Sequence, residues 1–193
     1  MSMLAYPSSL SLRALGWEFI TPKPEPKKFV GLAWPHSSNM DGILMVMMAQ
    51  QIGLNMSWMV KDAVNQPGLG AVVRGVGGVF IDRTKPNGVV GQMVDEFNAR
   101  DQFALVIPPE GTRSRRDYWK SGFYHIAVGA NVPIVPGFLD YGRKQGGFGP
   151  PIMPTGDVKA DMDAIRAFYE PREMLGKVHA DVGPILLREE AEG

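Results

Sequence analysis

Residues 35–41 of this 193-residue chain read Pro-His-Ser-Ser-Asn-Met-Asp and lie between two apolar segments, 29–34 and 43–48. On one continuous α-helix His36 and Asp41 would point about 140° away from each other and could not form a hydrogen bond. The proline disfavours helix at the residue before it, and Ser, Asn and Asp suit turns and helix N-caps. The stretch therefore predicts a strand, a turn and a helix, with the turn bringing imidazole and carboxylate together. A histidine held by an aspartate keeps one ring nitrogen available as a base.

The composition is that of an ordinary soluble domain with a substantial core, since 45% of the residues are hydrophobic. Twenty basic and twenty acidic residues cancel, so the chain lacks the overall basic field that drives nucleic-acid binding, and we expect no nucleic-acid partner. The absence of cysteine excludes disulfides and cysteine metal sites, and fits a reducing compartment. Three scattered histidines, His36, His125 and His179, do not predict a zinc site.

The first 28 residues form an N-terminal segment. Residues 1–15 lack the basic region and the uninterrupted apolar core of a cleaved signal peptide. Apolar residues within 4–20 offer a surface that either lies in a bilayer interface or packs on the core, and the sequence leaves both alternatives open. Residues 42–60 carry no formal charge, but polar side chains and Gly53 interrupt them. They predict a helix, a turn and a strand instead of a membrane span.

Strands and helices are expected to alternate along residues 29–193. Strands are expected at 29–34, 56–60, 79–82, 103–107 and 132–139. Helices are expected after residue 42, within 66–79, and at 89–100, 120–129 and 161–169. The alternation predicts a single α/β domain with a largely parallel central sheet flanked by helices. The prolines in 132–139 favour an edge strand or an irregular ladder there.

A second informative stretch, PPEGTRSRRDYWK at 108–120, follows a buried strand and precedes a helix. Ligands gather at the carboxyl ends of strands in parallel sheets. Gly111 allows a ligand to approach the backbone closely, Thr112 and Ser114 offer hydroxyl and amide donors, and Arg113 is one of three arginines that supply positive charge. The stretch predicts a phosphate-binding loop, with an exposed polar loop of solvated arginines as the alternative.

The chain resembles the glycerophospholipid acyltransferases of the 1-acyl-sn-glycerol-3-phosphate acyltransferase type. Four blocks in the family's order carry the resemblance: His-x4-Asp at 36–41, Gly-Val-Phe-Ile-Asp-Arg at 78–83, Glu-Gly-Thr-Arg-Ser at 110–114 and Val-Pro-Ile-Val-Pro at 132–136. Pro35 stands where many members place an asparagine.

The resemblance implies the family's α/β fold and the transfer of an acyl chain from a thioester to a hydroxyl of a lysophospholipid such as 1-acyl-glycerol-3-phosphate, a step of phospholipid biosynthesis. The donor would be acyl-CoA or acyl carrier protein. His36 would be the general base, and Asp41 would orient it, a role compatible with capping a helix. The attacking group is the substrate's own alcohol, so neither a cofactor nor a metal is implied.

The resemblance also implies a site for the acceptor phosphate. The residues that would form it are Arg83, Glu110, Gly111, Thr112 and Arg113. Glu110 would orient the glycerol or an arginine, and Lys61 and Ser114 are additional candidates. The methionines in residues 40–56 belong either to the core or to the wall of an adaptable acyl tunnel. The implied location is the cytoplasm, with peripheral contact to the inner face of the cell membrane as an open alternative.

Two rival functions remain at this point. A serine hydrolase would use Ser37, Ser38 or Ser121 with the His-Asp pair, but the chain has no Gly-x-Ser-x-Gly elbow. A non-catalytic module could bind anionic lipid through Arg115, Arg116 and the preceding Arg113. That alternative leaves the histidine and the aspartate without a role.

Overall fold

The central strand of the fold is β2 (Lys28–Trp34), which pairs in parallel with a strand on each side. The computed structural model describes residues 5–85, 87–174, 176–177 and 182–191. In this part of the chain the sheet has seven strands in the order β1-β7-β6-β2-β5-β3-β4. The other strands are β1 (Glu18–Phe19), β3 (Met56–Lys61), β4 (Gly78–Ile81), β5 (Phe103–Ile107), β6 (Ile134–Asp140) and β7 (Gln145–Phe148). The ladders between these strands are parallel except the one between β6 and β7, so the predicted α/β fold with a largely parallel sheet is confirmed.

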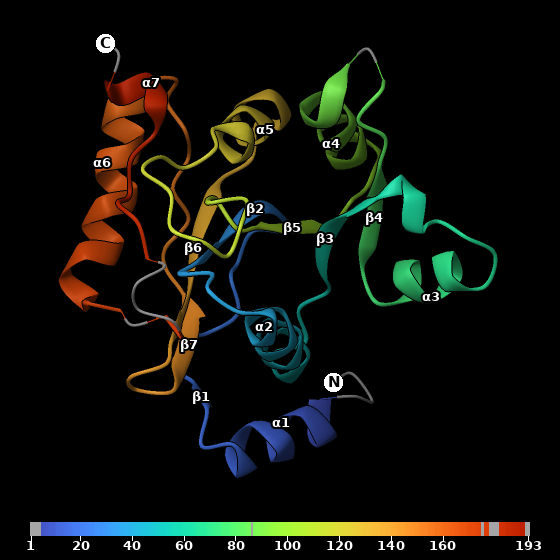
Figure 1. Cartoon of the computed structure of the whole chain (residues 1–193), viewed down its shortest axis with the longest axis vertical. Helices are drawn as coiled ribbons and strands as arrows, with labels where there is room; N and C mark the ends of the chain where they lie inside the picture. Colours follow the sequence, from blue (N-terminus) through green and yellow to red (C-terminus); the bar gives the residue numbers. More distant parts are fainter. Residues whose placement is uncertain (1–4, 86, 175, 178–181, 192–193) are drawn as a thin grey trace.

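Helices cover both faces of the sheet, as a parallel sheet requires. They are α1 (Ala5–Ala14), α2 (Asn39–Gln51), α3 (Leu69–Gly75), α4 (Gly88–Ala99), α5 (Gly122–Ala130), α6 (Val158–Tyr169) and α7 (Arg188–Ala191), with short 3-10 turns at Asp62–Val64 and Glu170–Arg172. Successive side chains of β2 point to opposite faces. Val30 and Leu32 pack in the core shared with α4, α5 and α6, whereas Phe29 packs on the side of α2. Figure 1 shows α4 and α5 on one side of the sheet and α2 on the other.

The five expected strands are present, each beginning and ending within two residues of the predicted bounds. The proposed edge position of residues 132–139 was wrong, because β6 is paired with β2 on one side and β7 on the other. The alternative of an irregular ladder is not observed either, because the register with β2 runs without interruption from Ile134 through Pro136 to Phe138. Pro136 lies just before the pairs that β6 makes with β7, and its carbonyl accepts a hydrogen bond from the Gly149 N–H.

The N-terminal segment is part of the fold. Leu12 of α1 is buried and packs with Leu44 and Met48 of α2, and β1 pairs in parallel with β7. Packing on the core is therefore the alternative that holds for Leu12, while Leu10 of the same helix is 67% exposed. Among the described residues, none of the helices has the length and apolar character needed to cross a membrane.

Candidate active site

The turn between β2 and α2 has the predicted geometry. Ser38 is the N-cap of α2, and its side chain accepts a hydrogen bond from the Met40 N–H at 3.2 Å. In return, Oδ2 of Asp41 accepts the backbone N–H groups of Ser37 and Ser38, both at 2.8 Å. This reciprocal arrangement is a capping box, which satisfies backbone donors that a helix start leaves open. It places the aspartate in the first turn of α2, facing back toward the end of β2.

The same carboxylate meets the histidine. Nδ1 of His36 lies 3.1 Å from Oδ2 of Asp41, and the two side chains are 19% and 1% exposed. On the other side, the hydroxyl of Tyr141 donates to Oδ1 of Asp41 at 2.6 Å. Burial raises the pKa of Asp41, but hydrogen bonds from His36, from Tyr141 and from the Ser38 backbone outweigh it and hold the pKa below 3.8. Asp41 is therefore a buried, ionised partner for the imidazole.

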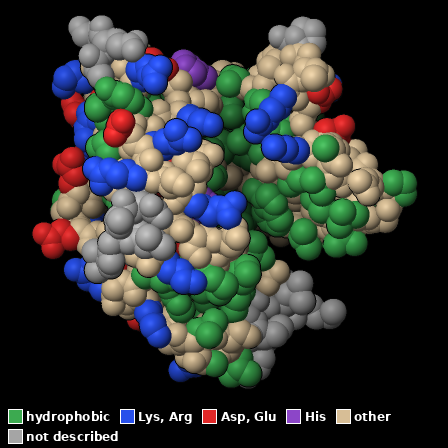
Figure 2. Space-filling view, in the orientation of Figure 1, with side chains coloured by type: hydrophobic (Ala, Val, Ile, Leu, Met, Phe, Trp, Pro, Cys, Tyr) green, Lys and Arg blue, Asp and Glu red, His purple; other side chains and the backbone are tan. Residues whose placement is uncertain are grey.

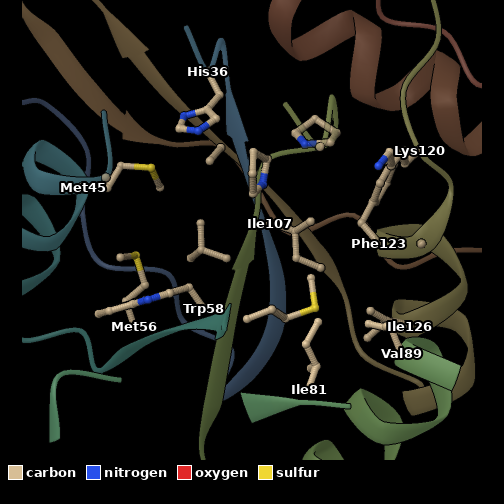
Figure 3. A pocket seen from close by; sticks show the side chains of 18 of the residues that line it. His36, Met45, Met56, Trp58, Ile81, Val89, Ile107, Lys120, Phe123 and Ile126 are labelled. Atoms are coloured by element: carbon tan, nitrogen blue, oxygen red, sulfur yellow. The ribbon is translucent and has the colours of Figure 1, made fainter. Parts of the chain in front are cut away.

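His36 lies at one end of a cavity of about 930 Å³. Its apolar wall comes from α2, β3, β4, α4 and α5, and includes Met45, Met47, Met56, Trp58, Phe123 and Ile126. Figure 3 shows His36 and Lys120 toward one end of this space and Met56, Trp58 and Ile81 toward the other. Three of the methionines in residues 40–56 line the cavity, whereas Met48 belongs to the core.

Three exposed cations line the same cavity: Lys61 at the end of β3, Arg83 just after β4 and Lys120 just before α5. Figure 2 shows basic side chains beside a hollow lined with hydrophobic ones. Lys120 was missed as a site residue, although it ends the stretch 108–120. The contact that brings it to the site appears only in the folded chain: Gly111 has a φ of 64°, and a Cβ there would come within 2.8 Å of the Lys120 side chain.

The Glu-Gly-Thr-Arg-Ser loop reaches the cavity through Gly111, whereas Thr112, Arg113 and Ser114 are not among the lining residues. The hydroxyl of Thr112 accepts from the Ser114 N–H at 3.4 Å. Arg113 donates to the side-chain oxygen of Asn39, a cavity-lining residue at the start of α2, at 2.5 Å. The structure thus joins the loop after β5 to the start of α2, and it places Arg113 one contact away from the cavity.

Glu110 has a different contact from the expected one. Its side chain is 2% exposed, and Oε2 accepts the backbone N–H of His36 at 3.3 Å. Burial raises its pKa to about 7, against the effect of that hydrogen bond. The carboxyl therefore braces the loop that carries the histidine instead of meeting an arginine.

The three serine candidates lie at different places, and none of them lines the cavity. Ser38 caps α2, Ser37 is 8% exposed, and Ser121 immediately precedes α5. His125 is an exposed residue of α5. Within the described residues, no group of three or more His, Asp or Glu side chains could hold a metal ion, and His179 lies outside them.

The segment that carries these site residues matches a known protein family. The family model described as Acyltransferase matches residues 25–139, which is more than half of the chain. The chain belongs to this acyltransferase family. All four sequence blocks lie inside the matched stretch.

Curated relatives of this acyltransferase-family chain carry one name. A 1-acyl-sn-glycerol-3-phosphate acyltransferase of Escherichia coli is 39% identical over 66 residues, covering 31% of this chain and 26% of that protein. The protein of the same name from Haemophilus influenzae is 30% identical over 107 residues, covering 52% of this chain and 43% of that protein. The matched stretches thus span less than half of these relatives' length.

A solved structure has a similar fold. The crystal structure of the 1-acyl-sn-glycerophosphate (LPA) acyltransferase PlsC from Thermotoga maritima superposes with a TM-score of 0.59 at 17% identity. The superposition covers 90% of this chain and 80% of that one. At this identity the likeness concerns the fold alone.

The raised pKa of Glu110 predicts a pH-dependent stability. In the folded chain the carboxyl keeps its proton up to about pH 7, whereas in the unfolded chain it ionises near 4.5. Because the folded state binds more protons in this window, the contribution of Glu110 to the free energy of unfolding falls as pH rises from 4.5 to about 7. Glu110→Gln keeps an acceptor for the His36 N–H and removes the titration. Urea unfolding at a series of pH values should show E110Q gaining stability relative to wild type across this window.

The matched control is Glu25→Gln, which changes an exposed carboxylate. It should keep the pH dependence of the wild type. If the stability of E110Q depended on pH as that of the wild type does, Glu110 would not be the group that binds the proton in this window.

Proposed function

We propose that this chain transfers a fatty acyl group from a thioester, acyl-CoA or acyl carrier protein, to a hydroxyl of a lysophospholipid such as 1-acyl-glycerol-3-phosphate. One observation carries the proposal: a His-Asp pair, three cations and an apolar wall meet at a single cavity. The names of the curated relatives support this choice of acceptor. The fold of the acyltransferase family supports the reaction type.

The pair suits general-base catalysis of acyl transfer. Nδ1 of His36 faces Asp41, so a proton on Nδ1 leaves Nε2 free to accept the proton of the acceptor hydroxyl. As that proton leaves, the hydroxyl oxygen attacks the thioester carbonyl carbon, and Asp41 stabilises the imidazolium that forms. Collapse of the tetrahedral intermediate breaks the carbon-sulfur bond, and the imidazolium returns the proton to the departing thiolate. The thioester is already activated, so the proposed reaction uses no cofactor and no metal.

The cavity suits a long acyl chain. Its volume of about 930 Å³ lies toward the upper end of the range for ligand pockets. Its methionines have unbranched, polarisable side chains that adapt to the shape of an apolar ligand. The acyl group would lie along this wall with its carbonyl near His36.

The acceptor phosphate would be held at the cationic part of the cavity. Arg83, Lys61 and Lys120 present charge there, and the backbone of Gly111 lies beside Lys120. Thr112 and Ser114 would add polar contacts from the same loop, and Arg113 would act through Asn39. Glu110 would contribute indirectly, by holding the His36 backbone.

We also propose peripheral contact with the inner face of the cell membrane. Ile43 of α2 and Val76 after α3 are 53% and 54% exposed, and both line the cavity. Val72 and Leu69 of α3 extend this apolar surface, at 63% and 49% exposure. Figure 2 shows hydrophobic side chains gathered over the α3 region beside the hollow. A lipid surface against α3 would let an acyl chain enter the cavity without crossing water.

His36→Ala tests the general base. Without the imidazole, kcat should fall by about 10²- to 10⁴-fold, the usual effect of losing a positioned base. The assay mixes the protein with acyl-CoA or acyl carrier protein and a panel of lysophospholipids and other alcohols, and identifies products by mass. His125→Ala, at an exposed histidine of α5, is the matched control and should keep full activity.

Full transfer by H36A would refute His36 as the general base. Binding of lysophospholipid by the wild type without transfer to any acceptor would favour the lipid-binding module. Rapid-quench labelling with a radioactive acyl thioester separates the other rival. A stable acyl-serine in the wild type would refute direct transfer and favour the hydrolase.

Arg83→Ala tests the phosphate site. Loss of a charged hydrogen-bond donor should raise KM for a phosphorylated acceptor about 10- to 100-fold and leave KM for a phosphate-free alcohol nearly unchanged. Arg115→Ala is the matched control, because Arg115 is exposed, lies outside the cavity lining and donates to the Val182 carbonyl. A larger rise in KM for R115A than for R83A would favour the arginine loop over the cavity cations.

Val72→Asp tests the membrane surface. Placing a charge on α3 should reduce binding to phosphatidylglycerol-containing vesicles at least about tenfold, as measured by cosedimentation. Val128→Asp changes an equally apolar, 44% exposed position on α5 and should leave vesicle binding unchanged. Equal binding by V72D and V128D would exclude α3 as the contact surface.

A further inference from the structure

The two oxygens of the Asp41 carboxylate have separate partners. Oδ2 accepts the backbone N–H groups of Ser37 and Ser38 and lies 3.1 Å from Nδ1 of His36. Oδ1 accepts the hydroxyl of Tyr141 at 2.6 Å. Hydrogen bonds therefore hold the carboxylate at both oxygens, and rotation about its Cβ–Cγ bond would break contacts at each of them.

Tyr141 is itself held from two directions. It lies in the turn between β6 and β7, where Oδ1 of Asp140 accepts the N–H groups of Gly142 and Arg143 at 2.9 and 3.2 Å. Its ring meets the buried Trp17 edge-on, with centroids 4.9 Å apart and an interplanar angle of 87°. Burial and the Asp41 contact raise the pKa of Tyr141 well above its ordinary value, so the hydroxyl remains a donor. These contacts aim the phenol at the aspartate.

We propose that Tyr141 is a positioning residue for the His36–Asp41 pair: its hydroxyl fixes Oδ1 of Asp41 so that Oδ2 faces the imidazole. The inference rests on the proposed acyl transfer for its catalytic meaning and on the observed contacts for its geometry. A general base needs a fixed tautomer and a fixed ring orientation, and the group that holds the carboxylate controls both. Tyr141 does not line the cavity, so it acts through Asp41 and not on the substrate.

The test compares two tyrosines with similar contacts. Tyr124 is buried and donates to Oδ2 of the buried Asp161 at 2.8 Å, away from the cavity. Tyr141→Phe and Tyr124→Phe each remove one hydroxyl that donates to a carboxylate and keep the ring. A loss of acyl-transfer activity that comes only from weaker packing or lower stability should therefore appear in both variants.

The first readout is the NMR titration of the His36 imidazole, assigned by its absence in H36A. In Y141F the carboxylate of Asp41 loses the donor that holds Oδ1, so the contact of Oδ2 with the imidazole changes and the His36 titration should shift from its wild-type position. In Y124F the titration should match the wild type. The other charged groups at the site are Glu110, bonded to the His36 backbone, and the cations Lys61, Arg83 and Lys120, which line the same cavity; both variants keep these residues.

The second readout is the kinetics of acyl transfer. In Y141F kcat should fall about tenfold, as expected for a lost hydrogen bond to a charged group, while KM for both substrates stays within about twofold. In Y124F kcat should stay at the wild-type value. A site-specific 3-fluorotyrosine at position 141 keeps the bond and strengthens the donor, so the His36 titration should move to lower pH. This third protein tests the inference even where Y141F does not fold.

The outcomes separate this inference from the proposed function. A His36 titration that is the same in wild type, Y141F and the fluorotyrosine protein would overturn the positioning role, and so would an unchanged kcat of Y141F in an active enzyme. If the wild type transfers no acyl group to any acceptor while the titration moves as expected, the contact stands as a feature of the pair and the proposed function is what fails.

Discussion

The hydrogen bonds that converge on the buried carboxylate of Asp41 are the interaction on which the site depends. The carboxylate closes the capping box of α2 through the backbone of Ser37 and Ser38, and it faces Nδ1 of His36 with the same oxygen. Burying a charge is costly unless it is paired and hydrogen-bonded. Here the donors of the turn and the hydroxyl of Tyr141 together outweigh burial and lower the pKa of Asp41, so the carboxylate stays ionised. The start of a helix and the orientation of a base are thus one structural feature.

Sheet topology then collects the rest of the site. β2, β5, β3 and β4 are neighbours and run parallel, so the segments that follow them emerge at one edge. The histidine follows β2, the Glu-Gly-Thr-Arg-Ser loop follows β5, Lys61 ends β3 and Arg83 follows β4. Ligands bind at this edge in open α/β sheets because loops from several strands converge there while the sheet below stays rigid. The bond from the His36 backbone to Glu110 ties the first two of these segments together.

The cavity combines a hydrogen-bonded His-Asp pair with exposed cationic side chains. Asp41 is buried and held by several hydrogen bonds, and His36 beside it is only partly exposed, whereas the cations at the cavity have exposed side chains. The apolar wall continues to the surface through Ile43 and Val76. This contrast suits the proposed acyl transfer, because the reacting atoms need fixed geometry while the bulky parts of the substrates need room to enter.

Local features of the sequence determined the alternation of strands and helices, the strand-turn-helix around Pro35 and the meeting of His36 with Asp41. These depend on residues a few positions apart, where proline, capping side chains and apolar periodicity act directly on the backbone. Tertiary structure decided that Tyr141, 100 residues from Asp41, completes the grip on the carboxylate. It also decided that Glu110 meets a backbone amide and that β7, with its two glycines and weak strand propensity, pairs with β6. Contacts of this kind depend on sheet register and on the packing of distant segments, and no local pattern in the chain records them.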